Sequence, residues 1–390
     1  MTIEGSSNTT FGKRIRLGMV GGGEGAFIGA VHRLAARLDD RYEFVAGALA
    51  STPEKARRSG EALGLDRSRI YPDFTAMANA EAAREDGIEA VSIVTPNHLH
   101  APVAEAFLAA GVHVICDKPL TTTLAEARAL RATVERSGRV FALTHNYTGY
   151  PMVRQAREMA RGGELGRLRL VQVEYVQDWL TERLEATGHK QAEWRTDPAR
   201  SGAGGCIGDI GTHAYNLADF ITGLAVDRLA ADVTTFVEGR ALDDNVQVML
   251  RYGSGAKGSL WASQVAPGHE NDLAIRVYGD KGGIAWRQTE PNYLTVSPFG
   301  RPPQRIARNG PGAGPAAARV SRVPPGHPEG YLEGFATIYS EVAEAILAAR
   351  EGRKAPPEVL FPTIEDGVKG VAFIEAALSS SRNGSSWVAV

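Results

Sequence analysis

Residues 15–26 read Ile15-Arg16-Leu17-Gly18-Met19-Val20-Gly21-Gly22-Gly23-Glu24-Gly25-Ala26, a short apolar run that ends in a glycine-rich turn. The apolar run predicts a buried strand, and the spacing of apolar residues over 26–38 predicts a helix after the turn. Gly21, Gly23 and Ala26 fit the pattern G-x-G-x-x-G/A, in which bare backbone lets a pyrophosphate approach a helix N-terminus. Such glycines also suit an ordinary flexible strand–helix connection, so the surrounding elements decide between the two interpretations.

The segments that follow alternate between strand-like and helix-like patterns. Strands are predicted at residues 15–20, 43–50, 90–95, 112–116 and 139–145. Helices are predicted at residues 26–38, 53–63, 98–110 and 124–137. This order predicts a parallel sheet covered on both faces, wound as a dinucleotide-binding Rossmann domain over residues 13–148. In that context the glycine turn is interpreted as a cofactor-binding turn.

Residues 149–390 are expected to form a second α/β domain, which binds substrate and supports oligomerisation. After a helix at residues 152–161, longer strands are predicted at residues 167–177, 228–238, 246–252, 257–264 and 273–278. The short turns between several of them favour an open, mostly antiparallel sheet. Residues 298–328 are rich in proline, glycine and arginine and are predicted to form a long loop, followed by helices at residues 331–349 and 364–380.

Charge and composition argue against several classes of protein. The chain carries 43 basic and 45 acidic residues, a net charge of −2, so no charge excess points to nucleic acid or to a membrane surface. Cys116 and Cys206 do not resemble a disulfide framework. Arg14-Ile15-Arg16 before the apolar run faintly imitates an export signal, but a first strand that enters a glycine turn explains the run better. The run is also too short to span a membrane, and we expect a cytoplasmic enzyme.

The end of the second predicted strand bears on the choice of cofactor. An acidic residue at this position binds the ribose hydroxyls of NAD, but this chain has Ala50-Ser51-Thr52 there. The missing carboxylate removes the usual obstacle to a 2′-phosphate, and Arg57 or Arg58 would be available to contact one. NAD and NADP therefore both stay open from these residues alone.

Polar residues follow the next two strands at the edge where open α/β sheets bind ligands. Thr95-Pro96-Asn97-His98-Leu99-His100 comes after one strand, and Asp117-Lys118-Pro119 comes after the next. The amide, imidazole and ammonium groups of these segments are interpreted as ligand contacts. Asn97 is alternatively a cap of the following helix, a role that is compatible with ligand contact, and Lys118 is alternatively a solvated surface charge.

Asp209 and His213 lie four residues apart in Gly208-Asp209-Ile210-Gly211-Thr212-His213, so a helix would place both on one face. Histidine titrates near neutrality, which suits removal of a hydroxyl proton while a hydride leaves the same carbon. A neighbouring carboxylate would orient the ring or bind a substrate hydroxyl. Alternatively, Asp209 caps a helix and His213 is packed in the core. A zinc site with Cys206 is disfavoured because paired ligand spacing is absent, and no metal is expected.

Together these residues resemble the Gfo/Idh/MocA oxidoreductase family, which includes glucose-fructose oxidoreductase and inositol dehydrogenases. The similarity spans nearly the whole chain, from the glycine turn through Thr95-Pro96-Asn97 and Asp117-Lys118-Pro119 to the 208–213 segment. The resemblance implies an N-terminal Rossmann domain, a C-terminal domain with an open sheet, and dimers or tetramers built across that sheet. It also implies that the catalytic residues are Lys118, Asp209 and His213.

Within the family, the extended turn at residues 22–29 and the segment Gly326-His327-Pro328-Glu329-Gly330-Tyr331 are most similar to levoglucosan dehydrogenases. That resemblance implies NAD-linked oxidation of the C3 hydroxyl of levoglucosan, 1,6-anhydro-β-D-glucopyranose, to a 3-keto sugar. An inositol or another pyranose is the alternative substrate. The longer glycine loop and the missing acidic residue depart from the family pattern. NAD is nevertheless favoured, because Ser51 and Thr52 can bond a ribose diol and Arg57 and Arg58 fall within the next helix.

Further contacts are expected where the two domains meet. Asn146 and Tyr147 follow the last Rossmann strand and offer a hydrogen-bonding and an aromatic surface to a sugar. Trp194, which alternatively only packs, precedes a glycine-rich run with Arg195 and Asp197. The predicted dinucleotide contacts are Gly21, Gly23, Ala26, Phe27, Ile28, Ser51, Thr52, Thr95, Asn97, His100, Asp117, Lys118, Trp194 and Arg195. The predicted substrate contacts are Lys118, Asn146, Tyr147, Asp197, Asp209 and His213.

The long loop contains an arginine cluster that imitates a phosphate-binding or nucleic-acid-binding patch. Its members are Arg301, Arg305, Arg308, Arg319 and Arg322. The interspersed prolines and glycines, the near-neutral total charge and the absence of aromatic residues between them instead predict a solvated or subunit-contacting loop.

Three classes of function compete at this point. The first is a polyol dehydrogenase, and the second is a dinucleotide sensor without turnover, which would not need the lysine, aspartate and histidine. The third is a hydrolase or lyase that oxidises its substrate only transiently.

Overall fold

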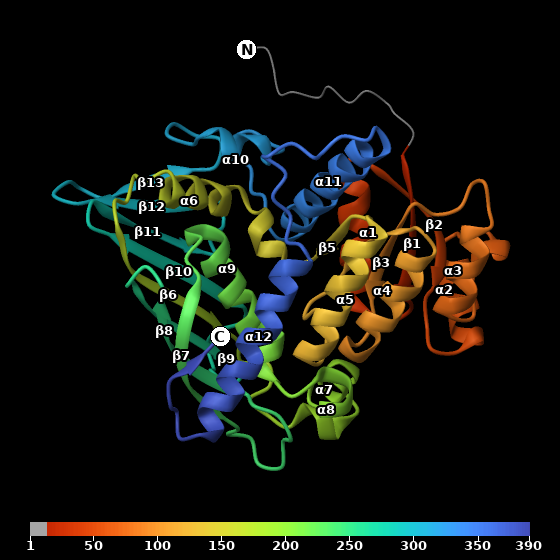
Figure 1. Ribbon diagram of the computed structural model, residues 1–390, viewed down its shortest axis with the longest axis horizontal. Coiled ribbons are helices and arrows are strands. Elements are labelled where there is room, and N and C mark those ends of the chain that lie inside the picture. The colour runs from red at the N-terminus through yellow and green to blue at the C-terminus, as the bar shows by residue number, and fades with distance from the viewer. Residues whose placement is uncertain (1–13) are drawn as a thin grey trace.

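The computed structural model describes residues 14–390, which form two sheets with helices packed against them (Figure 1). The predicted first residue of the Rossmann domain, Lys13, lies outside the described residues. Among the helices of residues 14–390, none combines the length and the apolar composition needed to cross a membrane.

The first sheet has five parallel strands in the order β2-β1-β3-β4-β5, which confirms the predicted Rossmann topology. Its strands are β1 (Ile15–Gly21), β2 (Tyr42–Ala48), β3 (Ala90–Val94), β4 (His113–Cys116) and β5 (Phe141–Leu143). The chain leaves β1 toward one edge for β2 and returns to the other side for β3. The carboxyl ends of β1 and β3 therefore flank the crevice where such sheets bind ligands.

The helices of this domain are α1 (Phe27–Leu38), α2 (Pro53–Ala62), α3 (Phe74–Ala82), α4 (His100–Ala109) and α5 (Leu124–Ser137). Four of them were predicted, although the first residues of the segment predicted at 98–110 form a 3₁₀ turn, Asn97–Leu99. The prediction missed α3 because its alanine-rich sequence lacks a clear apolar stripe. A cap from the Asp73 carboxylate to the amide of Ala76 marks the start of α3.

The second sheet has nine strands in the order β13-β12-β11-β10-β6-β9-β8-β7-β14, antiparallel except for the pair β6 and β9. Its strands are β6 (Leu168–Val176), β7 (Val226–Thr234), β8 (Asn245–Tyr252), β9 (Lys257–Ser263), β10 (Asp272–Gly279), β11 (Gly282–Arg287), β12 (Tyr293–Pro298), β13 (Gln304–Ala307) and β14 (Val388–Ala389). The prediction of an open, mostly antiparallel sheet is confirmed.

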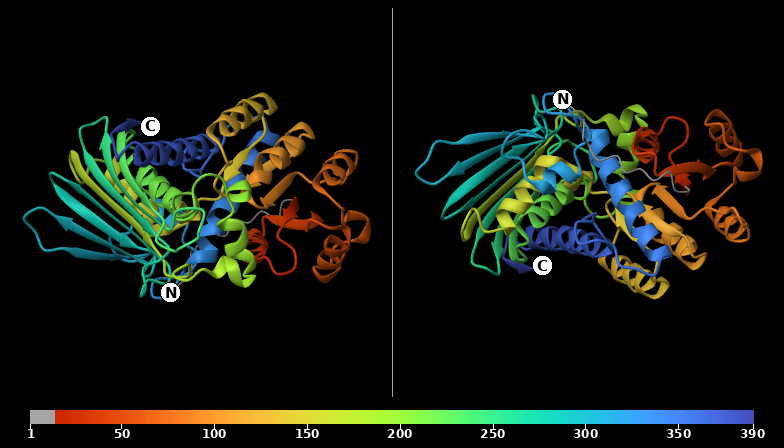
Figure 2. Two further views of the ribbon diagram at one scale, coloured as in Figure 1. Left: turned by 90° about the horizontal axis from the view of Figure 1, so that it is seen from below. Right: turned by 90° about the horizontal axis from the view of Figure 1, so that it is seen from above.

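Helices cover only one face of this sheet, as Figure 2 shows. They include α6 (Pro151–Arg161), α9 (Thr212–Thr222) and α12 (Ile364–Arg382). Along β8, Val246, Val248 and Leu250 are buried beneath them, whereas Gln247 and Met249 are exposed on the other face. Strand alternation thus leaves a broad outer face without a covering layer in the described chain.

The prediction of one long loop over residues 298–328 was wrong. The segment contains β13 and a short helix, α10 (Pro315–Arg319), and it follows two strands that were also missed, β11 and β12. These strands are short and separated by tight glycine or proline turns, so their pattern was too brief to distinguish from a loop. Pairing with β10 and with one another stabilises them.

The two halves of the chain are tied together by α11 (Tyr331–Arg350), which lies beside α1 (Figure 1). Apolar residues of α11, among them Phe335, Ile338 and Val342, share one buried cluster with Leu17 and Val31 of the Rossmann domain. On the opposite face of the first sheet, α3, α4 and α5 form a separate cluster. A helix from the C-terminal part of the sequence therefore completes the core of the N-terminal part.

Candidate active site

The glycine turn after β1 is packed too tightly for side chains. Gly21 and Gly22 have φ values of +80° and +72°, which favour glycine. A Cβ on Gly29 would lie 2.3 Å from the carbonyl oxygen of Gly22, and a Cβ on Gly23 would lie 2.5 Å from that of Leu49. The turn, the start of α1 and the end of β2 are therefore held in close backbone contact, as a pyrophosphate site requires.

The N-terminus of α1 has the properties of an anion site. Its N-cap residue, Ala26, provides no side-chain cap, and no acidic residue lies in the first turn. Phe27 begins the helix with 65% of its surface exposed and stacks on Tyr331 at 6.5 Å between ring centroids, while Ile28 is half-buried. The Lys190 ammonium, from α7 (Lys190–Arg195), lies 3.9 Å from the position of a Cβ on Gly25. A cation and a helix N-terminus thus converge beside the turn.

The groups at the end of β2 fit a free ribose diol better than a 2′-phosphate. Ser51 and Thr52 are exposed there. Arg57 pairs with Glu61 at 3.3 Å, and Arg58 pairs with Glu24 of the glycine turn at 3.1 Å. Both guanidinium groups already have a carboxylate partner and are mostly in solvent.

The edge formed by β3 and β4 is tightly organised. The His100 ring is fully buried, with Nδ1 at 2.8 Å from the Pro119 carbonyl oxygen and Nε2 at 3.0 Å from that of Thr95. It therefore connects the loops after the two strands. The Asn97 side chain donates to the Ser201 carbonyl oxygen at 2.9 Å, so the alternative that it caps a helix was wrong. The Thr95 hydroxyl is buried and has no hydrogen-bond partner among residues 14–390, so it is free to bond a ligand.

Asp117 braces the same edge, because its carboxylate accepts from the backbone amide of Lys118 and from the Thr144 hydroxyl. The Lys118–Pro119 peptide bond is cis. The Lys118 ammonium points away from bulk solvent and toward the second domain, with 13% of its side chain exposed. The interpretation of Lys118 as a solvated surface charge was therefore wrong.

Lys118 and Asp209 meet at the centre of the site. The ammonium donates to the carboxylate at 3.0 Å and to the backbone carbonyl of Asp209 at 2.6 Å. The other carboxylate oxygen accepts from Gln264 at 2.9 Å and lies 3.3 Å from Nε of Arg195. Burial would raise the pKa of Asp209, but the charges of Lys118 and Arg195 outweigh it and hold that pKa well below its usual range. Asp209 is therefore ionised.

The segment that carries Asp209 and His213 is a π-helical turn, Ile207–Gly211, that continues into α9. Its start is held by Asp243, whose carboxylate accepts from the amides of Gly205 and Ile207 at 2.6 and 2.8 Å. The alternative that Asp209 caps this helix was wrong. Within residues 14–390 no group of three or more His, Cys, Asp or Glu side chains is arranged to hold a metal ion.

His213 is nearly buried and surrounded by aromatic rings. The Tyr147 ring lies 5.0 Å from it, edge to face, and His145 Nδ1 lies 3.4 Å from His213 Nδ1. Burial, followed by the nearby Lys118 charge, lowers the pKa of His213 well below its ordinary value. The imidazole is therefore neutral at pH 7 and keeps one nitrogen lone pair.

A chain of polar side chains runs from Asp209 along the second sheet. Gln264 lies 3.5 Å from Gln177, whose amide donates to Asn271 at 2.6 Å. Tyr175 also donates to Asn271, at 2.8 Å, and its hydroxyl lies 2.6 Å from that of Tyr147. Because the Tyr175 proton is used on Asn271, Tyr147 donates to Tyr175. This wall offers the density of hydrogen bonds that a polyhydroxylated ligand needs.

The remaining predicted contacts have more varied surroundings. Asn146 is buried beside Tyr147, and its amide nitrogen has no hydrogen-bond partner in the described part of the chain. Trp194 is half-buried beneath the Arg195 guanidinium, 4.5 Å above its ring. Asp197 instead caps α8 (Pro198–Ser201) and pairs with Arg200 at 2.7 Å, so its carboxylate is occupied outside the Lys118–Asp209 cluster.

Sequence reasoning missed several residues of this site. Tyr175, Gln177, Gln264 and Asn271 lie on strands or strand ends, where they follow an ordinary alternating pattern. His145 follows the last Rossmann strand, β5, by two residues and precedes the predicted Asn146 and Tyr147, so its place in the sequence was a usable signal. Lys190 had none, because only folding brings it to the glycine turn.

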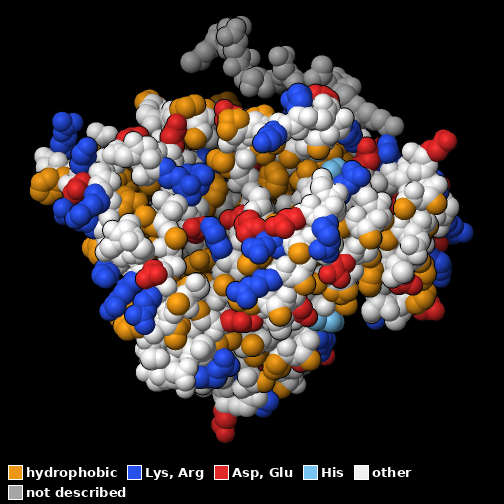
Figure 3. Space-filling view, viewed as in Figure 1, with side chains coloured by type: hydrophobic (Ala, Val, Ile, Leu, Met, Phe, Trp, Pro, Cys, Tyr) orange, Lys and Arg blue, Asp and Glu red, His pale blue; other side chains and the backbone are white. Residues whose placement is uncertain are grey.

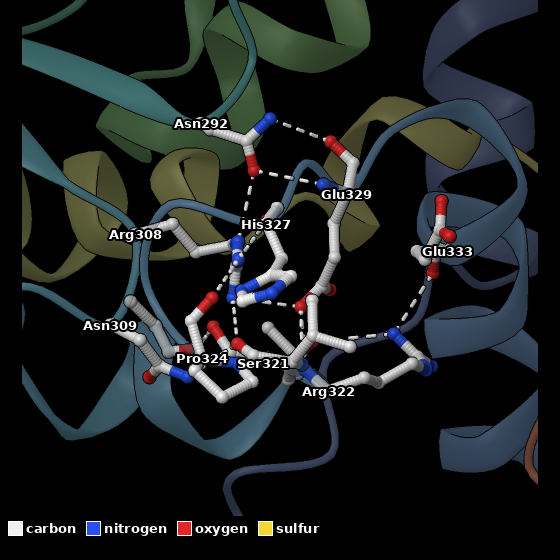
Figure 4. A network of polar contacts seen from close by, with 12 residues as sticks. Asn292, Arg308, Asn309, Ser321, Arg322, Pro324, His327, Glu329 and Glu333 are labelled. Carbon is white, nitrogen blue, oxygen red and sulfur yellow. Dashed lines mark hydrogen bonds and ion pairs between the residues drawn. The ribbon is translucent and has the colours of Figure 1, made fainter.

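The arginine cluster is structural rather than solvated for three of its members, which corrects the prediction. Arg308 is buried and pairs with Glu329 at 2.8 Å, within the polar network of Figure 4. Arg322 pairs with Asp39, and Arg319 pairs with Glu341 and Glu344. Asn292 bonds both the amide and the carbonyl of Glu329, two residues before Tyr331. The network thus fixes the loop that presents Tyr331 to Phe27. On the face seen in Figure 3, basic and acidic side chains are interspersed.

The comparisons with known proteins agree with this geometry. Residues 15–145 match the oxidoreductase family with an NAD-binding Rossmann fold, and residues 153–285 match the GFO/IDH/MocA C-terminal domain. A crystal structure of an oxidoreductase from Sinorhizobium meliloti is 58% identical, with a TM-score of 0.88 over 97% of this chain and 100% of that chain.

Two further relatives carry names that state a ligand or substrate. An inositol dehydrogenase homolog from Azotobacter vinelandii, complexed with NADH and myo-inositol, is 36% identical, with a TM-score of 0.91 over 97% of this chain and 98% of that chain. Levoglucosan dehydrogenase from Pseudarthrobacter phenanthrenivorans is 29% identical over 97% of this chain and 98% of the relative. The chain therefore belongs to the GFO/IDH/MocA family of oxidoreductases, and its first domain is that family's NAD-binding Rossmann fold.

Proposed function

We propose that the protein oxidises a secondary ring hydroxyl of a cyclic polyol to a ketone, with NAD as the hydride acceptor. The observation that carries this proposal is the convergence of Lys118, Asp209 and His213 at the carboxyl edge of the Rossmann sheet. A non-catalytic dinucleotide sensor has no need for a buried ammonium, an ionised carboxylate and a neutral imidazole together.

Each group has a distinct role in this proposal. Bound NAD supplies the acceptor for the hydride. His213, neutral at pH 7, takes the hydroxyl proton as the carbonyl forms. Lys118 donates a hydrogen bond to the oxygen on which negative charge develops, and Asp209 holds the ammonium in place. Tyr147 and Asn146 contact the ring and its other hydroxyls.

The dinucleotide is placed by the groups around the glycine turn. Gly21–Gly23 and the N-terminus of α1 would hold its pyrophosphate, with Lys190 as a further positive charge. Ser51 and Thr52 bond the adenosine ribose. We propose a preference for NAD over NADP, because Arg57 and Arg58 are engaged with Glu61 and Glu24.

Two cyclic polyols are the candidate substrates. Levoglucosan is supported by the extended glycine turn, by the 326–331 segment and by the relative that is 29% identical. The inositol class is supported by the higher identity, 36%, to a homolog bound to myo-inositol. Comparison of kcat/KM for levoglucosan, myo-inositol and simple pyranoses, with NAD and with NADP, decides between them. A tenfold preference for NADP, about 1.4 kcal/mol, would overturn the cofactor proposal.

The same assay separates the three classes of function. A dehydrogenase accumulates NADH in proportion to the ketone formed. A sensor binds NAD but forms no NADH with any polyol, and a transient oxidiser converts substrate without net NADH. Either of the last two results with all these substrates would contradict the proposal.

We also propose that the protein assembles as a dimer or tetramer through the open face of the second sheet, in the cytoplasm. Large apolar side chains stand on that sheet without cover, including Leu170 and Met249, which are 50% and 56% exposed. The mass measured by light scattering tests this directly, since a single chain has a mass of 41.6 kDa. A monomer at micromolar concentration would contradict the proposed assembly.

A further inference from the structure

His145 is a second buried imidazole beside the proposed base. It lies two residues after Leu143, the last residue of β5, and is 2% exposed. Its Nδ1 lies 3.4 Å from His213 Nδ1, and the two rings stand edge to face at 5.2 Å between centroids. The role argued below rests on the proposed function, in which His213 takes the substrate proton.

The position of His145 is fixed by its backbone. Its amide donates to the Leu143 carbonyl at 2.9 Å, and its own carbonyl accepts from the hydroxyl of Thr148, also at 2.9 Å. The preceding residue, Thr144, bonds Asp117, which also accepts from the amide of Lys118. The same loop thus sets the places of His145 and of the Lys118 ammonium.

Both imidazoles are neutral, so in their hydrogen bond one ring is the donor and the other is the acceptor. Burial, followed by the Lys118 charge, lowers the pKa of His145 to about 3, although Asp117 opposes this. Between two neutral rings whose Nδ1 atoms face each other, one Nδ1 must carry hydrogen and the other must accept it. If His145 donated, His213 would carry its proton on Nε2 and would be unable to act as a base there. If His213 donates, its Nε2 lone pair is free.

We propose that His145 is a positioning residue that accepts the Nδ1–H of His213 and so keeps His213 Nε2 available for the substrate proton. During oxidation the hydroxyl proton moves to Nε2, the hydride leaves the same carbon with its electron pair for NAD, and the C–O bond becomes a carbonyl. His213 is then an imidazolium whose Nδ1–H points at a neutral acceptor. A charged donor strengthens that bond, so the 3.4 Å contact shortens as the proton arrives.

Two substitutions separate positioning from packing. His145→Asn keeps an acceptor near the original Nδ1, whereas His145→Leu removes it. We expect kcat to fall 10- to 100-fold in His145→Leu, with KM changed less than threefold, and to stay within about fivefold in His145→Asn. The acid limb of the kcat profile should move to lower pH in His145→Leu only, because the imidazolium of His213 loses its acceptor.

A matched control is His113→Leu, which removes another buried histidine. His113 begins β4, at the end of that strand remote from Lys118. Its Nδ1 accepts from the amide of Val140, remote from the catalytic cluster. We expect a lower melting temperature but an unchanged acid limb. If His145→Leu behaves like this control, with wild-type kcat and pH profile once folded, the proposal is wrong.

The tautomer of His213 tests the inference without turnover. In the wild-type protein with ¹⁵N-labelled histidine, or in a neutron structure, His213 should carry hydrogen on Nδ1 and His145 on Nε2. The opposite assignment overturns the proposal even if His145→Leu does not fold. If wild type forms no NADH with any polyol but has the expected tautomers, the proposed function fails while the hydrogen-bond direction stands.

Discussion

The ammonium of Lys118 donates to the carboxylate of Asp209 at 3.0 Å and so joins the end of β4 in the first sheet's domain to the π-helical turn before α9. Each of the two side chains therefore contacts a residue of the other domain. Gln264 at the end of β9 completes the carboxylate's hydrogen bonds, and His213 lies one turn further along the chain. The proposed acid–base site therefore depends on contacts between the two halves of the chain.

Replacing His213 with alanine should lower kcat by about 10²- to 10⁴-fold, the usual contribution of general acid–base catalysis. The loss follows from removal of the neutral imidazole that takes the hydroxyl proton. Stopped-flow or steady-state formation of NADH measures it. A folded His213→Ala protein with unchanged kcat across the pH range would remove His213 from the mechanism.

Tyr147→Phe should raise KM for the polyol by about 10-fold and also lower the free energy of unfolding by about 1 kcal/mol. The phenol donates to Tyr175 at 2.6 Å, so only its oxygen lone pairs are left to accept a substrate hydroxyl. Kinetics at saturating NAD and urea denaturation give the two values. Tyr252→Phe, at a buried phenol whose oxygen lacks a partner, is the control for stability. An unaltered KM would show that Tyr147 does not touch the substrate.

Lys190→Ala should raise KM for NAD by about two- to fivefold and leave kcat nearly constant. The ammonium lies beside the glycine turn but is exposed, so its attraction for the pyrophosphate has the modest strength of a surface ion pair. The effect should shrink at high salt, since screening weakens exposed charges. Lys354→Ala, at another exposed lysine, serves as the control. Equal KM values for the two variants would contradict the prediction.

Arg308→Met should destabilise the fold by about 3–5 kcal/mol, because it leaves Glu329 charged and buried without its partner. The double variant Arg308→Met/Glu329→Gln should recover part of that loss, since it removes the unpaired charge as well. Chemical denaturation of the wild type, of Arg308→Met, of Glu329→Gln and of the double variant measures the coupling. Additive losses would mean that the two residues do not act as a pair.

Stability should decline as the pH falls from about 6.5 to 4. Burial lowers the pKa of both His32 and His113 to about 4. The unfolded chain therefore takes up protons at a higher pH than the folded chain, and acid favours unfolding through this window. His113→Asn, whose side-chain oxygen can still accept from the Val140 amide, should flatten the slope by about one proton, ~1.4 kcal/mol per pH unit. An unchanged slope would exclude His113 as a contributor.

The sequence by itself determined the order of the Rossmann strands, and it singled out the glycine turn proposed to bind the cofactor and the proposed catalytic residues Lys118, Asp209 and His213. These features depend on local properties: the period of apolar residues, the freedom of glycine backbone and the side chains that follow parallel strands. The strand β13 was missed because four residues do not establish a period, and α3 was missed because its alanine-rich sequence lacks an apolar stripe.

Only the tertiary structure decided what each polar group contacts. The pairing of Arg308 with Glu329, the approach of Lys190 to the glycine turn and the contact between His145 and His213 join residues that no local pattern relates. Asp197 is the opposite case. The sequence suggested a substrate contact, but in the structure its carboxylate caps α8. Burial also sets the protonation state of His213, since an imidazole enclosed beside Lys118 stays neutral where a solvated one would titrate.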